Sequence, residues 1–306
     1  MSKLANNAPR EQIERDNWLL QQSIKRSYQT EVVDKIQALS GELEVVQYGS
    51  LSIDPSKYSL YFLKSRHWNP ENRTVLVTGG VHGYETSGVQ GAIRFLQNKI
   101  TDYSNDFNFI VFPCISPWGY ETINRWNPYT IDPNRSFYEN SPSEEAKFVL
   151  EAITNLTNGV NEAVDLNAHF DLHETTDTDN SIFRPALASR DNVEQDNWNI
   201  PDGFYLVGDT LRPEAEFQKA MIEQVQKVTH IAPADDSGRI IGEKLEQFGV
   251  INYPTKRLGL CAGLSDAKYV TTTEVYPDSP KVDDEECILA QVASIVGGLN
   301  YIKSHD

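Results

Sequence analysis

The chain has 306 residues, of which 39% are hydrophobic and 23% are charged, as expected of a globular protein with a large core. Its formal net charge of −17 at pH 7 argues against nucleic acids and anionic membranes as partners, because both require a basic surface. No apolar run approaches the roughly 20 residues that span a bilayer, and the polar start of the chain lacks the apolar core of a secretion signal, so we expect a cytoplasmic protein.

The first predicted element is a helix. Apolar residues recur at helical spacings over residues 10–39, which favours one long helix there. We therefore expect a helical N-terminal segment, residues 1–42, that packs on a larger domain covering residues 43–306.

Beyond that segment, strand patterns alternate with helix patterns. Strands are predicted at 43–49, 58–64, 74–79, 108–114, 163–172, 248–253 and 269–276, with a turn at Asp54-Pro55-Ser56 between the first two. Helices are predicted at 86–99, 143–156, 213–229 and 284–302. The alternation predicts a single α/β domain, in which a mixed, mostly parallel twisted sheet is flanked by helices on both faces.

A long segment between the fourth strand and the second of these helices is predicted to be irregular. Residues 115–141 contain several prolines and glycines, and a loop of this length usually has a function. A second loop, Asp177-Thr178-Asp179-Asn180, lacks the glycine and the terminal glutamate of a calcium loop, so we interpret it as solvated.

The strand 74–79 ends in a motif that is typical of metal ligands. Two glycines follow the apolar run, then His82, and then Glu85 three residues later. The carboxyl edge of such a strand is where α/β folds place their active sites. A histidine and a glutamate at this spacing can also be a helix start, so the motif needs a third ligand elsewhere.

The third ligand is predicted at the end of the strand 163–172. His173 terminates that strand, as His82 follows its own, so both imidazoles can reach one crevice. Two histidines and one glutamate leave a coordination position open, which is the arrangement of catalytic zinc. His169 is the alternative ligand on the same face, and Asp171 can instead orient a histidine from behind.

The irregular segment also carries cationic and amide side chains. Arg125, Asn127, Asn134 and Arg135 lie within eleven residues, and arginine binds carboxylates through a bidentate fork. An anionic small substrate is therefore compatible with the acidic chain, because salt screens distant charges beyond about 10 Å.

Taken together, these motifs resemble the zinc carboxypeptidase A/B family over roughly residues 43–300. The matching pieces are Gly80-Val81-His82-Gly83-Tyr84-Glu85, Ser116-Pro117-Trp118-Gly119-Tyr120, Arg125-x-Asn127, Asp132-x-Asn134-Arg135, Asp171-Leu172-His173 and the strand Val270–Val275. Each piece alone is weak, but their order and spacing are specific.

The resemblance implies a zinc-dependent hydrolase that cleaves a peptide or amide bond next to a free carboxylate. His82, Glu85 and His173 would bind one Zn²⁺ per chain. Glu274 would be the general base, which takes a proton from the zinc-activated water and passes it to the leaving amine.

The same resemblance implies the substrate contacts. Arg125 would stabilise the developing oxyanion. Asn134 and Arg135 would bind the terminal carboxylate of a small peptide substrate. Tyr253 would be the mobile tyrosine that the family uses, with Tyr269 as the alternative.

Some residues depart from the family pattern and keep a second function open. Thr130, Pro133 and Glu174 stand where other residues are usual, and Asp171-Leu172-His173-x-Thr-Thr is similar to the aspartoacylase and succinylglutamate desuccinylase branch. That branch uses the same zinc site to hydrolyse N-acyl amino acids. Its members usually carry a β-rich domain after the catalytic glutamate, whereas only one helix is predicted after Glu274, which favours the carboxypeptidase-like form.

Overall fold

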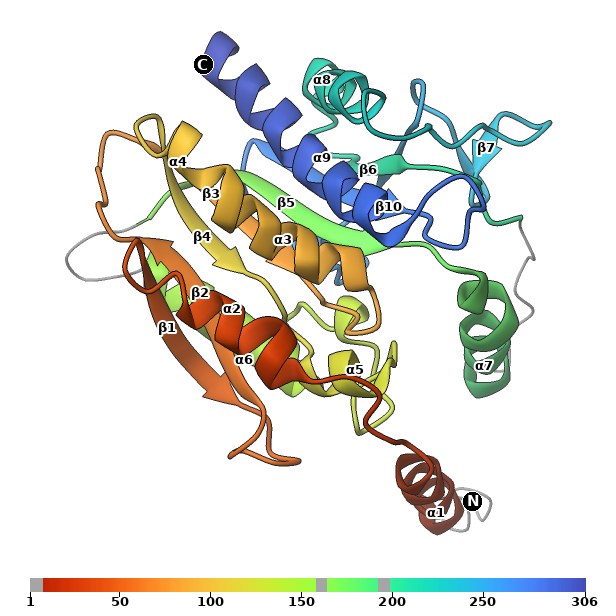
Figure 1. Cartoon of the computed structure of the whole chain (residues 1–306). Coiled ribbons are helices and arrows are strands. Elements are labelled where there is room, and N and C mark those ends of the chain that lie inside the picture. The colour runs from red at the N-terminus through yellow and green to blue at the C-terminus, as the bar shows by residue number, and fades with distance from the viewer. Residues whose placement is uncertain (1–7, 158–163, 192–198) are drawn as a thin grey trace.

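The computed structural model describes residues 8–157, 164–191 and 199–306, and in this part of the chain eight strands form one sheet (Figure 1). The strand order is β1-β2-β4-β3-β5-β10-β6-β9. The strands are β1 (Leu43–Ser50), β2 (Ser59–Ser65), β3 (Arg73–Gly79), β4 (Phe107–Phe112), β5 (Leu166–Glu174), β6 (Tyr205–Asp209), β9 (Val250–Tyr253) and β10 (Tyr269–Val275). A small separate ribbon pairs β7 (Arg239–Ile240) with β8 (Glu243–Lys244).

The centre of the sheet is parallel and its flanks are mixed. Strands β4, β3, β5 and β10 run parallel, whereas β1, β2 and β6 pair antiparallel with their inner neighbours. The register places Gly79 beside Leu172, and His173 beside Glu274. The predicted mixed, mostly parallel sheet is therefore confirmed, and the carboxyl ends of β3, β5 and β10 meet at one edge.

Helices cover both faces of the sheet because alternate side chains of its central strands are apolar on each side. Val75 and Val77 of β3 lie in one hydrophobic core, and Leu76 lies in the other. The first core is closed by α3 (Thr86–Asn98), α8 (Ala215–Val225) and α9 (Asp284–His305), which lie together in front of the sheet in Figure 1. The second core is closed by α6 (Glu144–Thr157). Within the described residues, no helix combines the length and apolar character that crossing a membrane requires.

The predicted single helix over 10–39 is wrong. The structure has α1 (Ala8–Leu20), then a non-helical stretch, then a π-helical turn (Gln29–Val33) and α2 (Asp34–Gln37). The break has a tertiary cause: the Arg26 guanidinium donates to the backbone oxygens of Tyr120 at 2.6 Å and Gly83 at 2.8 Å, and the Lys25 amide donates to Glu121 O at 2.8 Å. These bonds tie the stretch to the body of the protein.

The segment 115–141 is also more regular than predicted. Pro117 begins the short helix α5 (Pro117–Thr122), a position where the missing N–H of proline costs nothing. Pro133–Arg135 form a 3₁₀ turn, and the Asp132 side chain accepts a hydrogen bond from the backbone N–H of Asn134. The helices α4 (Ile100–Tyr103) and α7 (Arg184–Asp191) and the strands β6, β7 and β8 were also not predicted. Residues 1–7 of the predicted N-terminal segment and residue 163, the predicted start of β5, lie outside the described residues.

Candidate metal centre and substrate cavity

A tight turn after β3 brings His82 and Glu85 to the same point. Gly80 has a φ angle of +60°, a backbone conformation that residues with a side chain rarely adopt. At Gly83 an added Cβ would lie 2.1 Å from the backbone nitrogen of Tyr120, so only glycine fits there. The turn therefore depends on glycines that let the chain reverse against α5.

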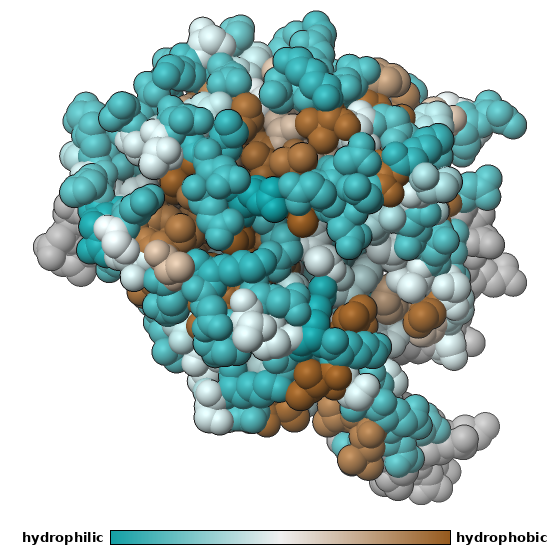
Figure 2. Space-filling model, in the orientation of Figure 1, coloured by the Kyte–Doolittle hydropathy of each residue, from teal (hydrophilic) through white to brown (hydrophobic). Residues whose placement is uncertain are grey.

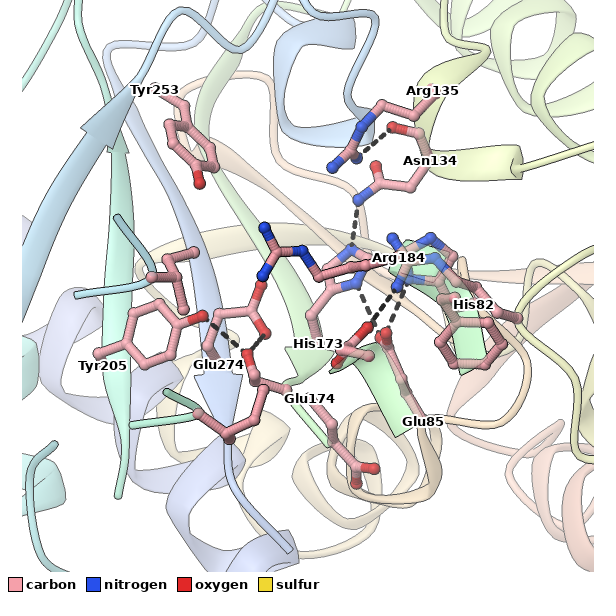
Figure 3. Close-up of a pocket in the computed structure, with 16 residues that line it drawn as sticks. His82, Glu85, Asn134, Arg135, His173, Glu174, Arg184, Tyr205, Tyr253 and Glu274 are labelled. Atoms are coloured by element: carbon pink, nitrogen blue, oxygen red, sulfur yellow. Dashed lines mark hydrogen bonds and ion pairs between the residues drawn. The ribbon is translucent and has the colours of Figure 1, made fainter. Parts of the chain in front are cut away.

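Three buried side chains converge at this edge of the sheet (Figure 3). The Nδ1 atom of His82 lies 2.7 Å from Oε1 of Glu85, and Nδ1 of His173 lies 2.7 Å from Oε2 of the same carboxylate. The side chains are at most 3% exposed. His82, Glu85 and His173 thus offer ligand atoms that all lie within 4.8 Å of one another.

This donor set fits a zinc ion. Two imidazole nitrogens and a carboxylate are the ligands of many catalytic zinc sites, and they leave one position open. Oε2 of Glu85 is completely buried, and although Nδ1 of His173 lies 2.7 Å away, no hydrogen bond of good geometry reaches this oxygen within the described part of the chain. A buried carboxylate oxygen without a donor is costly, and a bound cation would remove that cost.

The far nitrogens of both histidines face carboxylates. Nε2 of His82 lies 2.8 Å from Oδ1 of Asp132, and Nε2 of His173 lies 3.1 Å from Oδ2 of Asp171. Such partners favour a proton on Nε2, which would leave Nδ1 of each ring available to bind a metal ion. Asp171 thus occupies the orienting position that the sequence left open, whereas the orienting position of Asp132 was not foreseen.

The alternative ligand His169 lies in a separate buried group with Asp171 and Cys261. The hydroxyl oxygen of Thr78 lies 2.9 Å from Nε2 of His169, 2.6 Å from Oδ1 of Asp171 and 3.6 Å from Sγ of Cys261. The Thr78 hydroxyl is thus in contact with all three side chains. Burial lowers the pKa of His169 to about 4, which keeps the ring neutral and hydrogen-bonded.

Glu274 enters the site from β10, beside His173 in the sheet register. Its Oε2 accepts a hydrogen bond from the Thr175 hydroxyl at 2.8 Å, and that hydroxyl lies 2.7 Å from the hydroxyl of Tyr205. Burial raises the pKa of Glu274 to about 8. Neither Thr175 nor Tyr205 was singled out from the sequence, because their contact depends on the pairing of β6 with β10.

Arg125 is held by two carboxylates, one of which, Asp132, also contacts His82. Its Nε lies 3.2 Å from Oδ2 of Asp132, and its Nη1 lies 3.1 Å from Oδ1 of Asp179. The interpretation of 177–180 as a solvated loop is therefore wrong for Asp179, whose side chain is only 18% exposed. Asp179 begins a π-helical turn (Asp179–Phe183) that leads into α7, and its ion pair with Arg125 fixes this turn.

Asn134 and Arg135 lie on the 3₁₀ turn at the rim of the site. The Oδ1 atom of Asn134 accepts the backbone amide of Cys261 at 2.8 Å, which leaves its Nδ2 3.4 Å from Nε2 of His173. Nη1 of Arg135 donates to the Asn134 carbonyl at 3.1 Å. Both side chains face the same space as the histidines in Figure 3.

The two candidate tyrosines lie in different environments. Tyr253 of β9 lines the cavity, and burial raises its pKa to about 12. Tyr269 lies in the core, where its ring centroid is 4.9 Å from that of Phe217. Of the two, only Tyr253 is at the cavity.

One cavity of about 310 Å³ lies beside the three candidate metal ligands and Glu274. The sequence-predicted residues that line it are His82, Glu85, Arg125, Asn134, Arg135, His173, Tyr253 and Glu274. Residues that line it and were not predicted include Thr175, Asp179, Arg184, Tyr205 and Ile241. A small cavity with histidines, carboxylates and guanidinium groups is suited to hydrolysis of a small anionic substrate.

The fold and this site are those of a metal-dependent hydrolase. The match to the family model described as zinc carboxypeptidase covers residues 39–197, and the chain belongs to this family. It is a zinc metallocarboxypeptidase-like hydrolase, as the sequence motifs predict. No curated protein sequence matches the chain.

Solved structures share the fold at low sequence identity. A candidate metallopeptidase from Shewanella amazonensis is 19% identical, with a TM-score of 0.66 over 92% of this chain and 98% of the other. Carboxypeptidase A from Helicoverpa armigera is 14% identical, with a TM-score of 0.60 over 97% of this chain and 81% of the other. A metallo-carboxypeptidase from Pseudomonas aeruginosa, in complex with (2-guanidinoethylmercapto)succinic acid, is 15% identical. Its TM-score is 0.58 over 89% of this chain and 68% of the other.

Proposed function

We propose that the protein cleaves a peptide or amide bond next to a free carboxylate, with one zinc ion held by His82, Glu85 and His173. The observation that carries this proposal is the convergence of two Nδ1 atoms on the two oxygens of one buried carboxylate, within the cavity that also contains Glu274. A bound zinc ion would polarise the scissile carbonyl and acidify the attacking water.

In the proposed mechanism, Glu274 moves the proton. Its carboxylate takes a proton from the attacking water and passes it to the leaving nitrogen. A carboxyl group with a pKa near 8 is well matched to accept and return a proton near neutral pH. Arg125, held by Asp132 and Asp179, would stabilise the negative charge that develops on the carbonyl oxygen.

Asn134 and Arg135 would bind the terminal carboxylate of the substrate. They lie on one turn beside the cavity, and the guanidinium of Arg135 presents a planar fork of N–H donors that matches the two oxygens of a carboxylate. Tyr253 would close over the bound substrate from β9. The substrate is then a small peptide or an acyl amino acid, and assays with both kinds decide between them: rapid turnover of N-acyl amino acids with inert peptides would favour the deacylase alternative.

We also propose that residues 43–306 form the catalytic domain, on which the N-terminal segment 1–42 packs. In the described part of this segment, the ring of Trp18 contacts that of Trp118 with centroids 5.8 Å apart, and Arg26 donates to the Gly83 carbonyl in the turn that carries the metal ligands.

Replacing Arg135 by alanine should distinguish substrates by their terminus. We expect kcat/KM for peptides with a free terminal carboxylate to fall about a hundredfold, and to change far less for the same peptides with an amidated terminus, because only the former lose a charged hydrogen-bond pair. Steady-state kinetics on both forms measure this, with Arg94→Ala on the surface as the control. Equal losses on both forms would mean that Arg135 does not bind the carboxylate.

Replacing Thr175 by valine should shift the pH dependence. The Thr175 hydroxyl lowers the pKa of Glu274, so its loss raises this pKa further. A general base is active when deprotonated, so the rate falls as pH drops through its pKa. The acid limb of kcat/KM should therefore move to higher pH by about half a unit or more. Thr175→Ser keeps the hydroxyl and should retain the original limb; an unchanged limb in Thr175→Val would contradict the link.

A further inference from the structure

The proposed ligands His82 and Glu85 are the two ends of one tight turn. The Glu85 amide donates to the His82 carbonyl at 3.2 Å, so these residues occupy the first and last positions of a β-turn, and Gly83 and Tyr84 are its central residues. The carbonyls of the central residues take no part in the hydrogen bond that closes such a turn, and when buried they need donors from elsewhere. The spacing of the two ligands therefore depends on what holds the turn from outside.

Arg26, in the N-terminal segment, supplies those donors. Its Nη2 donates to the Gly83 carbonyl at 2.8 Å and lies 3.5 Å from the Tyr84 carbonyl oxygen. Its Nη1 donates to the hydroxyl oxygen of Thr86 at 2.6 Å, and this hydroxyl donates to the Tyr84 carbonyl at 3.2 Å. One guanidinium group thus contacts both central residues of the turn and the first residue of α3.

The same guanidinium joins the turn to α5. Its Nε donates to the Tyr120 carbonyl at 2.6 Å, and its central carbon lies 3.5 Å from the centre of the Tyr120 ring. Gly83 packs directly on the backbone of Tyr120, so Arg26 bridges two segments that already touch. A planar fork of five N–H donors can make all these bonds at once, whereas the ammonium group of a lysine is a single point of charge.

The backbone on each side of Arg26 is fixed to the body of the protein. The Lys25 amide donates to the Glu121 carbonyl at 2.8 Å, and the Tyr28 amide donates to Oε1 of Glu121 at 3.0 Å. The Tyr28 hydroxyl donates to the Ser59 carbonyl at 2.8 Å. Figure 2 shows α1 projecting from the surface at the lower edge of the molecule, whereas in Figure 1 the stretch between α1 and α2 passes beside α5. Arg26 is therefore presented to the turn from a well-held backbone.

We propose that Arg26 is a positioning residue of the metal centre, which holds the turn so that His82 and Glu85 are already placed to bind zinc. This inference rests on the proposed function, in which these two residues are zinc ligands. A ligand set that is held in place by its surroundings binds a metal more tightly than one that must be ordered on binding. The N-terminal segment then contributes to metal affinity, although Arg26 precedes residues 39–197, which match the family model.

Arg26→Lys tests this assignment, because it keeps the positive charge but cannot reach the same oxygens together. Zinc affinity, measured by competition with a chelator, should fall at least about tenfold, within the 10–100-fold that the loss of an outer partner of a metal ligand costs. Tyr28→Phe is the control, since it removes the bond to the Ser59 carbonyl in the same segment without touching the turn. It should lower the unfolding temperature and leave zinc affinity unchanged. Unchanged zinc affinity in Arg26→Lys, or an equal loss in both variants, would overturn the inference.

Hydrogen exchange of the zinc-free protein gives a second readout. The backbone amides of residues 83–87 should exchange faster in Arg26→Lys than in the wild type, and at the wild-type rate in Tyr28→Phe; equal rates in all three proteins would contradict the proposal. If Arg26→Lys does not fold, Thr86→Val replaces it, because this change removes only the acceptor of Nη1, and Thr86→Ser should keep the wild-type zinc affinity.

The outcomes distinguish this inference from the proposed function. A wild-type protein that binds zinc but hydrolyses neither peptides nor acyl amino acids would refute the proposed reaction, and the zinc affinities of the variants would still decide the role of Arg26. Normal hydrolysis with unchanged zinc affinity in Arg26→Lys would refute the role of Arg26 alone. A wild-type protein that binds no zinc would overturn both.

Discussion

Replacing Glu274 by glutamine should lower kcat/KM at least about a hundredfold while leaving zinc content unchanged. Glutamine has nearly the same shape, but it cannot accept a proton from water. Glu274 lies beside His173 in the sheet register without belonging to the group of metal-ligand atoms, so the metal site should remain intact. Steady-state kinetics and elemental analysis of the same preparation measure the two effects together.

The control for this variant is Glu285→Gln, which makes the same change on the surface, where Glu285 pairs with Arg94. We expect normal turnover from it. Near-normal turnover by Glu274→Gln would remove Glu274 from the mechanism. A loss of zinc in Glu274→Gln would show instead that this carboxylate supports the metal centre.

Replacing Glu85 by glutamine should abolish stoichiometric zinc binding and, with it, activity. The two oxygens of Glu85 face the Nδ1 atoms of both histidines, so the substitution removes the only negative charge among the three ligands. We expect zinc affinity to fall by more than about a hundredfold, because loss of an orienting partner alone costs 10–100-fold. Elemental analysis after dialysis, and thermal unfolding with and without zinc, measure the effect.

Asp171→Asn provides a variant with a smaller expected loss of zinc affinity, for comparison with Glu85→Gln. Asp171 contacts the far nitrogen of His173 rather than the metal position, so its substitution should weaken zinc binding by only about 10–100-fold. Zinc should also raise the unfolding temperature of the wild type and not that of Glu85→Gln. If Glu85→Gln kept one tightly bound zinc ion per chain, the ligand assignment would have to be abandoned.

Local patterns were sufficient to predict the parts of the molecule that depend on the chain nearby. The apolar run before Gly79 predicted a central strand, because strands covered on both faces are largely apolar. The strand before His173 was also predicted, although it contains His169 and Asp171 between its apolar residues. The positions of His82 and His173 at the ends of those strands then predicted their proximity, which the structure has. The role of Glu274 could be suggested only by resemblance, since nothing local distinguishes it from other strand glutamates.

Contacts between distant segments account for what the sequence did not predict. The helix predicted over 10–39 is interrupted because Arg26 bonds to the backbone of Gly83 and Tyr120, which no periodicity reveals. Asp179 was wrongly predicted to be solvated because its partner, Arg125, lies 54 residues away in sequence. Arg184 was overlooked for the same reason: a lone arginine in a polar stretch gives no local sign that it faces a cavity.

The pairing of β5 with β10 has a consequence for how this protein can diversify. His173 and Glu274 are neighbours in one hydrogen-bonded ladder, so the backbone itself sets the spacing between the proposed metal ligand and the proposed base. Asn134, Arg184 and Ile241, in contrast, reach the cavity from turns and from the start of a helix. Insertions or substitutions in those connecting segments can therefore change the substrate preference without changing the spacing between His173 and Glu274.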